Sequence, residues 1–273
     1  MTIAVVGHVE YTEFAPVERL PRSGEIIEAQ GAWQQAAGGG AVAAVQIAKL
    51  AGGCLFVTAL GDDELGRRAA SELEAMGVEL AVAWRPEPQR RAFVFLDGDG
   101  ERTITVIGDR LVPRGTDALP WPRLAEADAV YFTGGDAGAL RRARAARHVV
   151  ATVRAGPALA RSGVELDALV MSAGDPGERF LDGDIDPPPR AVIRTRGAGG
   201  GTIETAPGSE REWAAPALPG AWVDAHGAGD SFAGGLTVGL GRDLPLDEAV
   251  TLAARCGAAA VTGRGPYEGQ LTA

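Results

Sequence analysis

Lysine is nearly absent from this chain of 273 residues, since Lys49 is the single lysine among 26 basic residues. It stands inside a helix-like run with no glycine-rich loop before it. The pattern G-x-x-x-x-G-K-[ST] does not occur, which excludes a P-loop site, and no strand carries the lysine of a protein kinase. Schiff-base chemistry is disfavoured for the same reason. Any phosphate would therefore be held by backbone amides, helix ends, arginine or a metal ion.

Cysteine and long apolar runs are also scarce. Cys54 and Cys256 lie in apolar, alanine- and glycine-rich surroundings, which predicts two buried free thiols in a reducing compartment. No run of 18 apolar residues occurs, so no membrane span is predicted. The first residues, 1–7, lack the basic segment of an export signal and predict a strand instead. We expect a cytoplasmic protein.

The charge balance is acidic, with a formal net charge of −10. Nucleic-acid phosphates would be repelled at long range, so no nucleic-acid partner is predicted. One basic cluster, residues 141–147, has its arginines spaced by alanines and predicts a helix with a solvated face. The apolar content of 46% is ordinary for a globular protein with a sizeable core.

Strand-like and helix-like segments alternate along most of the chain. Short apolar runs predict strands at 3–6, 55–59, 129–132, 149–153, 168–171 and 191–195. Helices are predicted at 41–50, 64–76, 137–147, 177–181, 231–240 and 246–261. This alternation predicts an α/β fold in which helices cover both faces of a central, mostly parallel sheet.

Two stretches interrupt that alternation. Residues 10–36 contain prolines, a glycine and an alternating run at 25–29. Residues 90–108 predict a hairpin, because strand-like runs flank a D-G-D-G turn. We predict that both segments form one small antiparallel β-sheet, a lid on a single domain that spans residues 1–273.

The segment 224–232, D-A-H-G-A-G-D-S-F, predicts a glycine-rich turn that opens a helix with Asp230 in its first turn. The first amides of a helix lack partners and carry partial positive charge, so they can hold a phosphate. A carboxylate beside such a phosphate is what phosphoryl transfer to a hydroxyl requires. The alternative is that Asp230 only stabilises the helix end, and this motif alone supports both interpretations equally.

Other motifs stand in a fixed order around this one. They are a diglycine turn at 38–39 before a helix, G-D-D-x-x-G at 61–66, the hairpin, T-x-G at 195–197 and G-A-G-D at 227–230. Each motif alone is compatible with an ordinary turn or helix cap. Their order and spacing together resemble the ribokinase-like (PfkB) carbohydrate kinases over essentially the whole chain. The resemblance implies ATP-dependent phosphorylation of a hydroxyl on a sugar or sugar-like molecule.

The resemblance also implies roles for individual residues around the transferred phosphate. Asp230 would be the general base, and the amides of Gly227, Ala228 and Gly229 would form the anion hole. Closing the lid would protect the phosphoryl group from water. Asp224 matches a position that often helps to hold a monovalent cation such as K⁺, and the sequence leaves this open because Ala225 and His226 replace the usual threonines.

The nucleotide would lie at the turn after the predicted strand 191–195. The resemblance implies contacts from Thr195, Gly197 and Gly200. Because this turn joins two strands, a dinucleotide fingerprint, which must open a helix, is disfavoured; a hairpin without a ligand is the alternative. Asp175 would also contact the nucleotide, and Glu178 would place Mg²⁺ through water, although the two also fit a capping box.

The acceptor site departs from the family pattern. The resemblance places substrate contacts at Glu10, Thr12, Gly38 and Gly39, but the usual aspartate and asparagine sugar anchors align with Thr12 and Ala43. Glu10 is a candidate substitute, two positions away. The altered anchors leave a sugar, an amino sugar or a nucleoside open as the acceptor.

The sequence leaves other functions open. A nucleoside kinase of the same fold and a non-catalytic nucleotide- or metabolite-sensing protein are alternatives to the sugar kinase. A nicotinamide-dependent oxidoreductase would rest on the α/β alternation alone. The resemblance further implies a homodimer that forms through the lid. No chemical role is assigned to His8 or His226.

Overall fold

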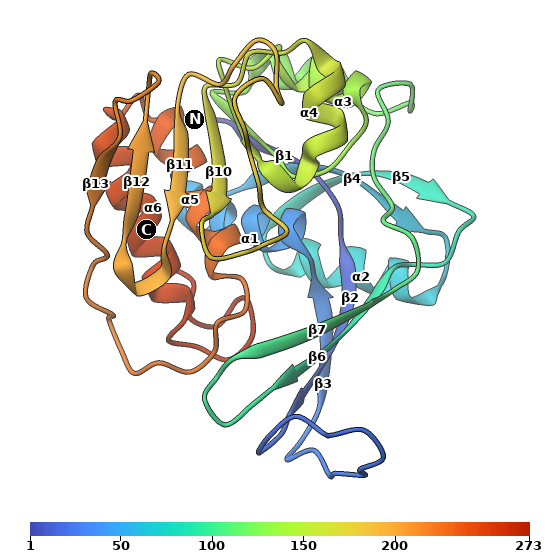
Figure 1. Ribbon diagram of the computed structural model, residues 1–273. Helices are drawn as coiled ribbons and strands as arrows, with labels where there is room; N and C mark the ends of the chain where they lie inside the picture. The colour runs from blue at the N-terminus through green and yellow to red at the C-terminus, as the bar shows by residue number, and fades with distance from the viewer.

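Two β-sheets of different size organise the chain in the computed structural model, which describes residues 1–273 (Figure 1). The larger sheet consists of β1 (Ile3–Val6), β4 (Cys54–Gly61), β5 (Val78–Arg85), β8 (Ala129–Phe132), β9 (His148–Thr152), β10 (Ala168–Ser172), β11 (Val192–Thr195), β12 (Gly201–Glu204) and β13 (Arg211–Trp213). Its order is β13-β12-β11-β10-β9-β8-β1-β4-β5, and only the pairs β11–β12 and β12–β13 are antiparallel. Every residue of β1, β4 and β8 is buried, as expected for parallel strands covered on both faces.

Helices cover both faces of this sheet. They are α1 (Gly39–Ala51), α2 (Glu64–Ala75), α3 (Ala137–Ala143), α4 (Gly156–Ser162), α5 (Ala228–Gly241) and α6 (Leu246–Ala260), with 3₁₀ turns η1 (Trp121–Glu126), η2 (Val153–Ala155) and η3 (Gly197–Gly199). Ile3 and Val5 of β1 pack in a core with α1, α2, α5 and α6, whereas Ala4 and Val6 face η1, α3 and α4. The predicted fold class is confirmed. No helix combines the length and the apolar content that a membrane span requires.

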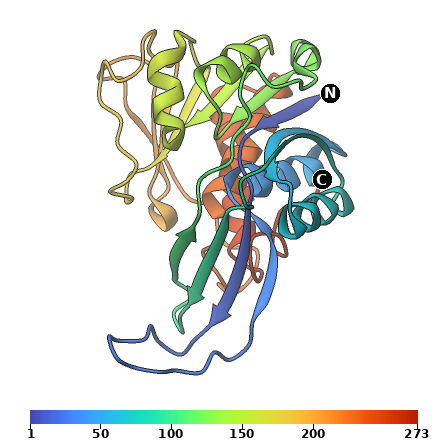
Figure 2. The same cartoon turned by 90° about the vertical axis from the view of Figure 1, so that its right-hand side faces the viewer.

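The smaller sheet projects away from the larger one, as Figure 2 shows. It contains β2 (Glu10–Pro16), β3 (Trp33–Ala37), β6 (Arg91–Leu96) and β7 (Arg102–Ile107) in the order β3-β2-β6-β7. The pairs β2–β3 and β6–β7 are antiparallel, and the central pair β2–β6 is parallel. The predicted hairpin is confirmed, because residues 91–96 and 102–107 pair on either side of the predicted turn.

Three local predictions need correction. The alternating run at 25–29 does not join the small sheet with the rest of segment 10–36; Ile26 is 99% exposed, and no neighbouring strand lies beside it. Residues 177–181 form no helix; Asp175 instead accepts a hydrogen bond from the amide of Gly177, which closes a local turn. The helix predicted at 137–147 ends at Ala143.

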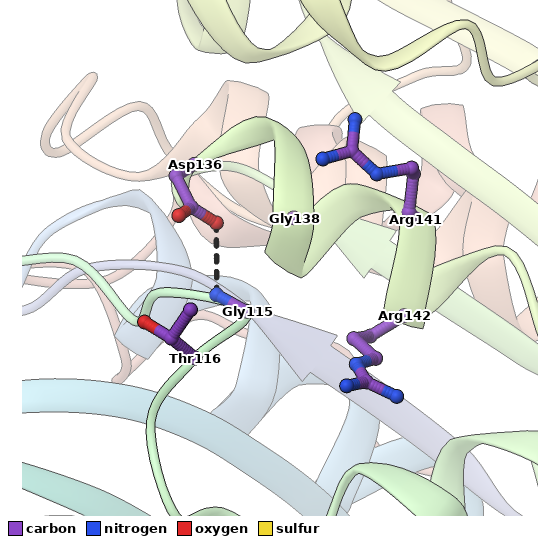
Figure 3. Close-up of a pocket in the computed structure, with 6 residues that line it drawn as sticks. All are labelled: Gly115, Thr116, Asp136, Gly138, Arg141 and Arg142. Atoms are coloured by element: carbon purple, nitrogen blue, oxygen red, sulfur yellow. Dashed lines mark hydrogen bonds between the residues drawn. The ribbon is translucent and has the colours of Figure 1, made fainter.

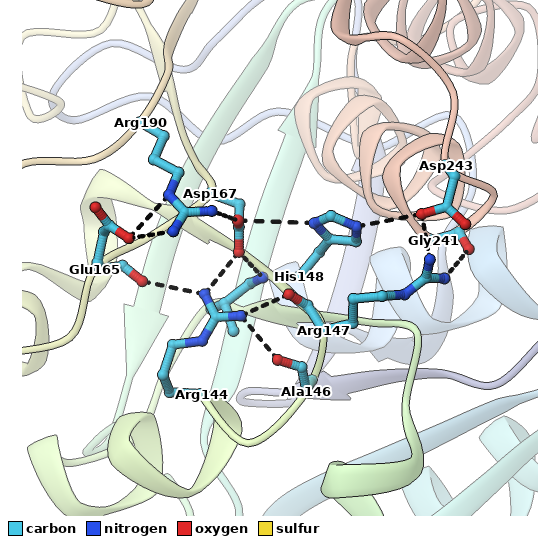
Figure 4. A network of polar contacts seen from close by, with 10 residues as sticks. Arg144, Ala146, Arg147, His148, Glu165, Asp167, Arg190, Gly241 and Asp243 are labelled. Atoms are coloured by element: carbon cyan, nitrogen blue, oxygen red, sulfur yellow. Dashed lines mark hydrogen bonds and ion pairs between the residues drawn. The ribbon is translucent and has the colours of Figure 1, made fainter.

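Both cysteines, Cys54 and Cys256, are buried and free, as the sequence predicts. The arginines of 141–147 divide into two groups. Arg141 and Arg142 are exposed on α3, in agreement with a solvated face. Arg144 and Arg147 instead belong to a network of polar contacts at the amino ends of β9 and β10 (Figure 4).

Asp167 is the centre of that network, just before β10 begins. Its carboxylate accepts hydrogen bonds from Arg144 at 2.6 Å, from the amide of Val149 at 2.8 Å and from Arg190 at 3.1 Å. The ring of His148 lies between Asp167 and Asp243, at 3.7 Å and 3.6 Å (Figure 4). Burial favours the neutral form of Asp167, but these hydrogen bonds outweigh it and hold the pKa of the carboxyl below its usual range.

We predict that Asp167→Asn lowers the free energy of unfolding by about 2 kcal/mol at pH 7, because the charge-assisted hydrogen bonds are lost. Chemical denaturation measures the loss. Since the folded-state pKa is lowered, the stabilisation exists above the unfolded pKa and should vanish as the pH falls through the folded pKa. Glu165→Gln is the matched control, because this more exposed carboxylate pairs only with Arg190. Equal losses in the two variants would contradict the prediction.

Candidate active site

The amino end of α5 presents backbone amides without protein partners. The amides of Gly227, Ala228, Gly229 and Asp230 donate to no protein oxygen, and the first bond of the helix runs from the Ser231 amide to the Gly227 carbonyl at 2.8 Å. Gly227 has φ 80°, in the left-handed region that favours glycine, and a Cβ there would come within 3.0 Å of neighbouring side chains. A Cβ on Gly229 would meet no atom within 4 Å. The predicted anion hole therefore faces open space.

The carboxylate of Asp230 lies beside this turn and accepts no hydrogen bond from the protein. A Cβ on Gly39 would stand 2.8 Å from Asp230 Oδ1 and 3.0 Å from Thr133 Oγ1, so the diglycine turn and the end of β8 reach the carboxylate. Burial raises the pKa of Asp230 to about 6; Arg102 and Arg154 oppose the shift, while Glu178 and Glu10 add to it. A carboxylate with that pKa can accept a proton near neutral pH.

The diglycine turn lies between Asp230 and the start of β2. Gly38 has φ 90° and precedes α1, and a Cβ on it would come within 2.9 Å of the Glu10 amide. A side chain at Gly38 would displace the β2 backbone, and one at Gly39 would displace the side chains of Asp230 and Thr133. The structure thus brings Glu10, Gly38, Gly39 and Asp230 together from three distant parts of the sequence.

One face of β2 continues this surface into the small sheet. Glu10, Thr12 and Phe14 alternate along the strand and so share a face. Thr12 is 1% exposed, and Phe14 packs edge-on against His226 at 5.0 Å between ring centroids. The opposite face turns toward α2, where Tyr11 is hydrogen-bonded. Glu10 and Thr12 therefore lie on the side of the small sheet that faces the turn before α5.

Several positively charged groups surround the site that sequence reasoning did not identify. Arg90 Nε lies 2.7 Å from Glu10 Oε1. His8 is 6% exposed, and its pKa is lowered well below the usual value by burial and by the charges of Arg110, Arg90 and Arg154. The scarcity of lysine was the available signal, since it left phosphate binding to arginine. With 25 arginines in the chain, that signal could not select these three.

The predicted nucleotide residues lie at the ends of β10 and β11. Thr195 is the register partner of Ser172, and its hydroxyl donates to the Met171 carbonyl at 3.4 Å. Gly197 is exposed with φ 56°, and a Cβ there would meet nothing within 4 Å. Gly200 is explained without a ligand, because its Cβ would overlap the Trp213 carbonyl on the neighbouring strand.

Asp175 and Glu178 both bind Arg154, which follows β9. The other oxygen of Glu178 accepts from the Ser172 amide at 2.6 Å. Its charge acts on Asp230, which places Glu178 at the same site. A carboxylate that reaches Mg²⁺ only through water can keep both protein contacts, so the residues present fit the predicted role.

Asp224 joins two loops of the structure. It is 1% exposed, and its two oxygens accept from the amides of His226 at 2.7 Å and Gly265 at 2.9 Å. No cluster of three or more acidic, histidine or cysteine side chains that could hold a metal occurs in the structure. A monovalent cation beside Asp224 stays a prediction.

A separate pocket lies at the start of α3 (Figure 3). It is lined by Gly115, Thr116, Asp136, Gly138, Arg141 and Arg142. Asp136 caps α3 by accepting from Ala139 at 2.7 Å, and it also accepts from Gly115 at 2.9 Å. No residue predicted for phosphoryl transfer lines this pocket, and its carboxylate is already used by the local fold.

Comparison with known proteins gives consistent matches. The pfkB family carbohydrate kinase model matches residues 2–160 and 185–273. ATP-dependent ribose-1-phosphate kinase of Halopiger xanaduensis is 30% identical over 278 residues, which cover 92% of this chain and 89% of that protein. Aminoimidazole riboside kinase of Salmonella typhimurium is 29% identical over 284 residues, which cover 86% of each.

Solved structures show the same fold. Ribokinase of Arabidopsis thaliana, complexed with ribose and ATP, superimposes with a TM-score of 0.76 at 22% identity, covering 99% of this chain and 96% of that one. Ribokinase of Giardia lamblia gives 0.80 at 17% identity, with the same coverage. The oxidoreductase alternative is not supported. This chain belongs to the pfkB family of carbohydrate kinases, and it is an ATP-using phosphotransferase that acts on a sugar or nucleoside.

Proposed function

We propose that this kinase transfers the γ-phosphoryl group of ATP to a hydroxyl of a sugar or sugar-like small molecule, with Asp230 as the general base. One observation carries the proposal. The carboxylate of Asp230 has no protein hydrogen bond, and it lies beside a row of unpartnered amides at the start of α5. A non-catalytic sensor would have no use for an unpaired carboxylate in that position.

The chemistry follows from these two groups. Asp230 accepts the proton of the acceptor hydroxyl while its oxygen attacks the γ-phosphorus and the bond to the leaving oxygen of ADP breaks. The amides of Gly227, Ala228 and Gly229 donate to the phosphoryl oxygens as charge moves onto them. Mg²⁺ neutralises phosphate charge when bound, and Glu178 would hold it through water. Thr195, Gly197 and Asp175 would contact the nucleotide.

The small sheet would act as the lid of the single domain. Its strand β7 contacts the segment before α5, because Arg102 donates to the Ala225 carbonyl at 3.1 Å and the Ala225 amide donates to Gly100 at 3.2 Å. The β2 face with Glu10 and Thr12 would then lie against the acceptor and keep water from the phosphoryl group. A homodimer through the lid remains a prediction, which light scattering tests.

The names of the relatives suggest which acceptors to test. Ribose 1-phosphate and aminoimidazole riboside appear in the names of two sequence relatives, and ribose in that of a structural neighbour. All three molecules contain a ribose ring, so we propose a ribose-containing acceptor. A nucleoside kinase is the alternative within the same proposal. An ADP-release assay over sugars, amino sugars, sugar phosphates and nucleosides tests both.

Asp230→Asn should lower kcat by roughly 10²–10⁴-fold, because the amide cannot accept the hydroxyl proton. The folded protein holds a proton on Asp230 more tightly than the unfolded chain, so the charge opposes folding above the folded pKa. At pH 8 the variant should therefore be at least as stable as the wild type and still bind ATP.

Asp247→Asn is the matched control for this variant, because Asp247 is an exposed aspartate in the first turn of α6. Its turnover should be unchanged. If Asp230 only stabilises its helix, the two substitutions would behave alike and turnover of Asp230→Asn would stay within about tenfold of wild type.

The pH dependence of kcat/KM should report the raised pKa of Asp230. The base must be deprotonated, so kcat/KM should rise about tenfold per pH unit below about pH 6 and level off above it. Steady-state kinetics between pH 4.5 and 8, in the range where the protein stays folded, measure the profile. A limb near the ordinary aspartate value of about 4 would contradict the assignment.

Gly39→Ala should lower kcat by roughly 10- to 100-fold while the fold is kept. The new Cβ would stand 2.8 Å from Asp230 Oδ1 and displace the base, whereas alanine is favourable at the first residue of α1. Gly53→Ala is the control, because a Cβ there meets no atom within 4 Å. Normal turnover in Gly39→Ala would show that the base is not held by this close approach.

A further inference from the structure

Arg110 lies on the segment that returns from β7 to the large sheet, and its guanidinium has no partner in the protein. It takes part in no ion pair and no side-chain hydrogen bond. Neighbouring arginines differ, since Arg90 pairs with Glu10 and Arg154 binds Glu178 and Asp175. Arg110 is therefore the one arginine of this group whose charge the chain does not balance.

The charges that act on Arg110 show where it lies. They are those of Arg90, Glu10, Arg154 and Asp230, which come from the small sheet, the end of β9 and the start of α5. Arg110 thus lies near Glu10 and Asp230, which stand on the acceptor side of the site. Half-buried there, its guanidinium loses water without forming an ion pair. Burial and the charges of Arg90 and Arg154 lower its pKa, although Glu10 and Asp230 oppose the shift.

A second polar group on the same side is also unmatched. His8 is 94% buried, and its Nδ1 atom has no hydrogen-bond partner. Its neighbours include Arg110, whose charge lowers the pKa of the ring. Buried polar atoms are satisfied in most proteins, so an orphan beside an unpaired guanidinium indicates groups that a ligand completes.

The chemistry of a guanidinium restricts that ligand. Its planar fork of N–H donors matches the two oxygens of a carboxylate or phosphate, and a neutral hydroxyl leaves its charge unbalanced. Glu10 forms its ion pair with Arg90 and makes none with Arg110. The fork of Arg110 is therefore left for an oxygen pair of the bound molecule.

We propose that the acceptor carries an anionic group, a phosphate ester or a carboxylate, apart from the hydroxyl that reacts, and that Arg110 binds this group. The inference rests on the proposed function, because Asp230 fixes where the reacting hydroxyl lies. Arg110 would then select charged sugars over neutral ones. The competing role is contact with the γ-phosphate of ATP, which would affect every acceptor equally.

Isothermal titration calorimetry without nucleotide tests the inference directly. The probes are ribose, ribose 5-phosphate, ribose 1-phosphate and ribonate, so that a neutral sugar is compared with phosphate and carboxylate forms. At least one anionic form should bind wild type roughly 30-fold more tightly than ribose, and Arg110→Gln should lose that preference. Comparing the ribose phosphates with ribonate shows whether the protein prefers a phosphate or a carboxylate.

Two further variants keep this test specific. Arg110→Lys, which keeps the charge without the fork, should retain part of the preference. Arg91→Gln removes an exposed arginine from the opposite face of the same sheet and should change nothing. If ribose binds as tightly as its anionic forms, if no anionic form binds, or if Arg110→Gln weakens all four probes equally, the inference is wrong.

ADP release separates this inference from the proposed function. Turnover with neutral acceptors alone would leave the kinase intact and overturn the anionic acceptor. Binding of an anionic sugar that depends on Arg110, without ADP release, would support the inference and contradict the proposed chemistry. A raised KM for ATP in Arg110→Gln with unchanged acceptor binding would assign Arg110 to the donor phosphate instead.

Discussion

The close approach of the diglycine turn to Asp230 is the constraint on which the site depends. A side chain at Gly39 would reach the carboxylate, and one at Gly38 would reach the β2 backbone. The two glycines therefore let the start of α1 lie between the small sheet and α5. Because α1 also packs against α5 in the main core, the same contact that positions the base is supported by buried apolar surface. The base is held by the core of the protein, although its own carboxylate has no hydrogen bond.

Charged side chains are paired at one end of the strands of the large sheet and unpaired at the other end. At the amino ends of the strands, Asp167 is surrounded by donors and its pKa is lowered. At the carboxyl ends, Asp230 lacks a donor and its pKa is raised, while Arg110 lacks an acceptor. Partly buried groups without partners oppose folding, and both of these stand where a bound ligand would complete them. The ion pairs and hydrogen bonds around Asp167, at the amino ends, therefore stabilise the fold, whereas the unpaired groups at the carboxyl ends do not.

The sequence predicted what local chemistry determines. The hairpin of β6 and β7 formed as expected because its D-G turn lies within the segment, and the helix at 228 begins at its glycine turn. The run at 25–29 failed because alternation produces a strand only beside a partner. The contacts of Glu178 could not be predicted from the sequence. Its carboxylate could belong to a capping box or to an ion pair, and the fold decides between them because β9 places Arg154 beside it.

Arg110 could not be selected from the sequence, because its role depends on what it lacks. Twenty-five arginines are present, and Arg90 and Arg154 near the site form ion pairs with acidic side chains. Arginine and lysine differ at such a position, because an ammonium could rotate toward water, whereas a half-buried planar guanidinium needs an acceptor in a fixed plane. The same reasoning bears on the missing sugar anchors. Thr12 is buried and uncharged where the family places a carboxylate, and an aspartate there would add negative charge to the side from which an anionic acceptor enters. The uncharged Thr12 and the unpaired Arg110 both favour a negatively charged acceptor.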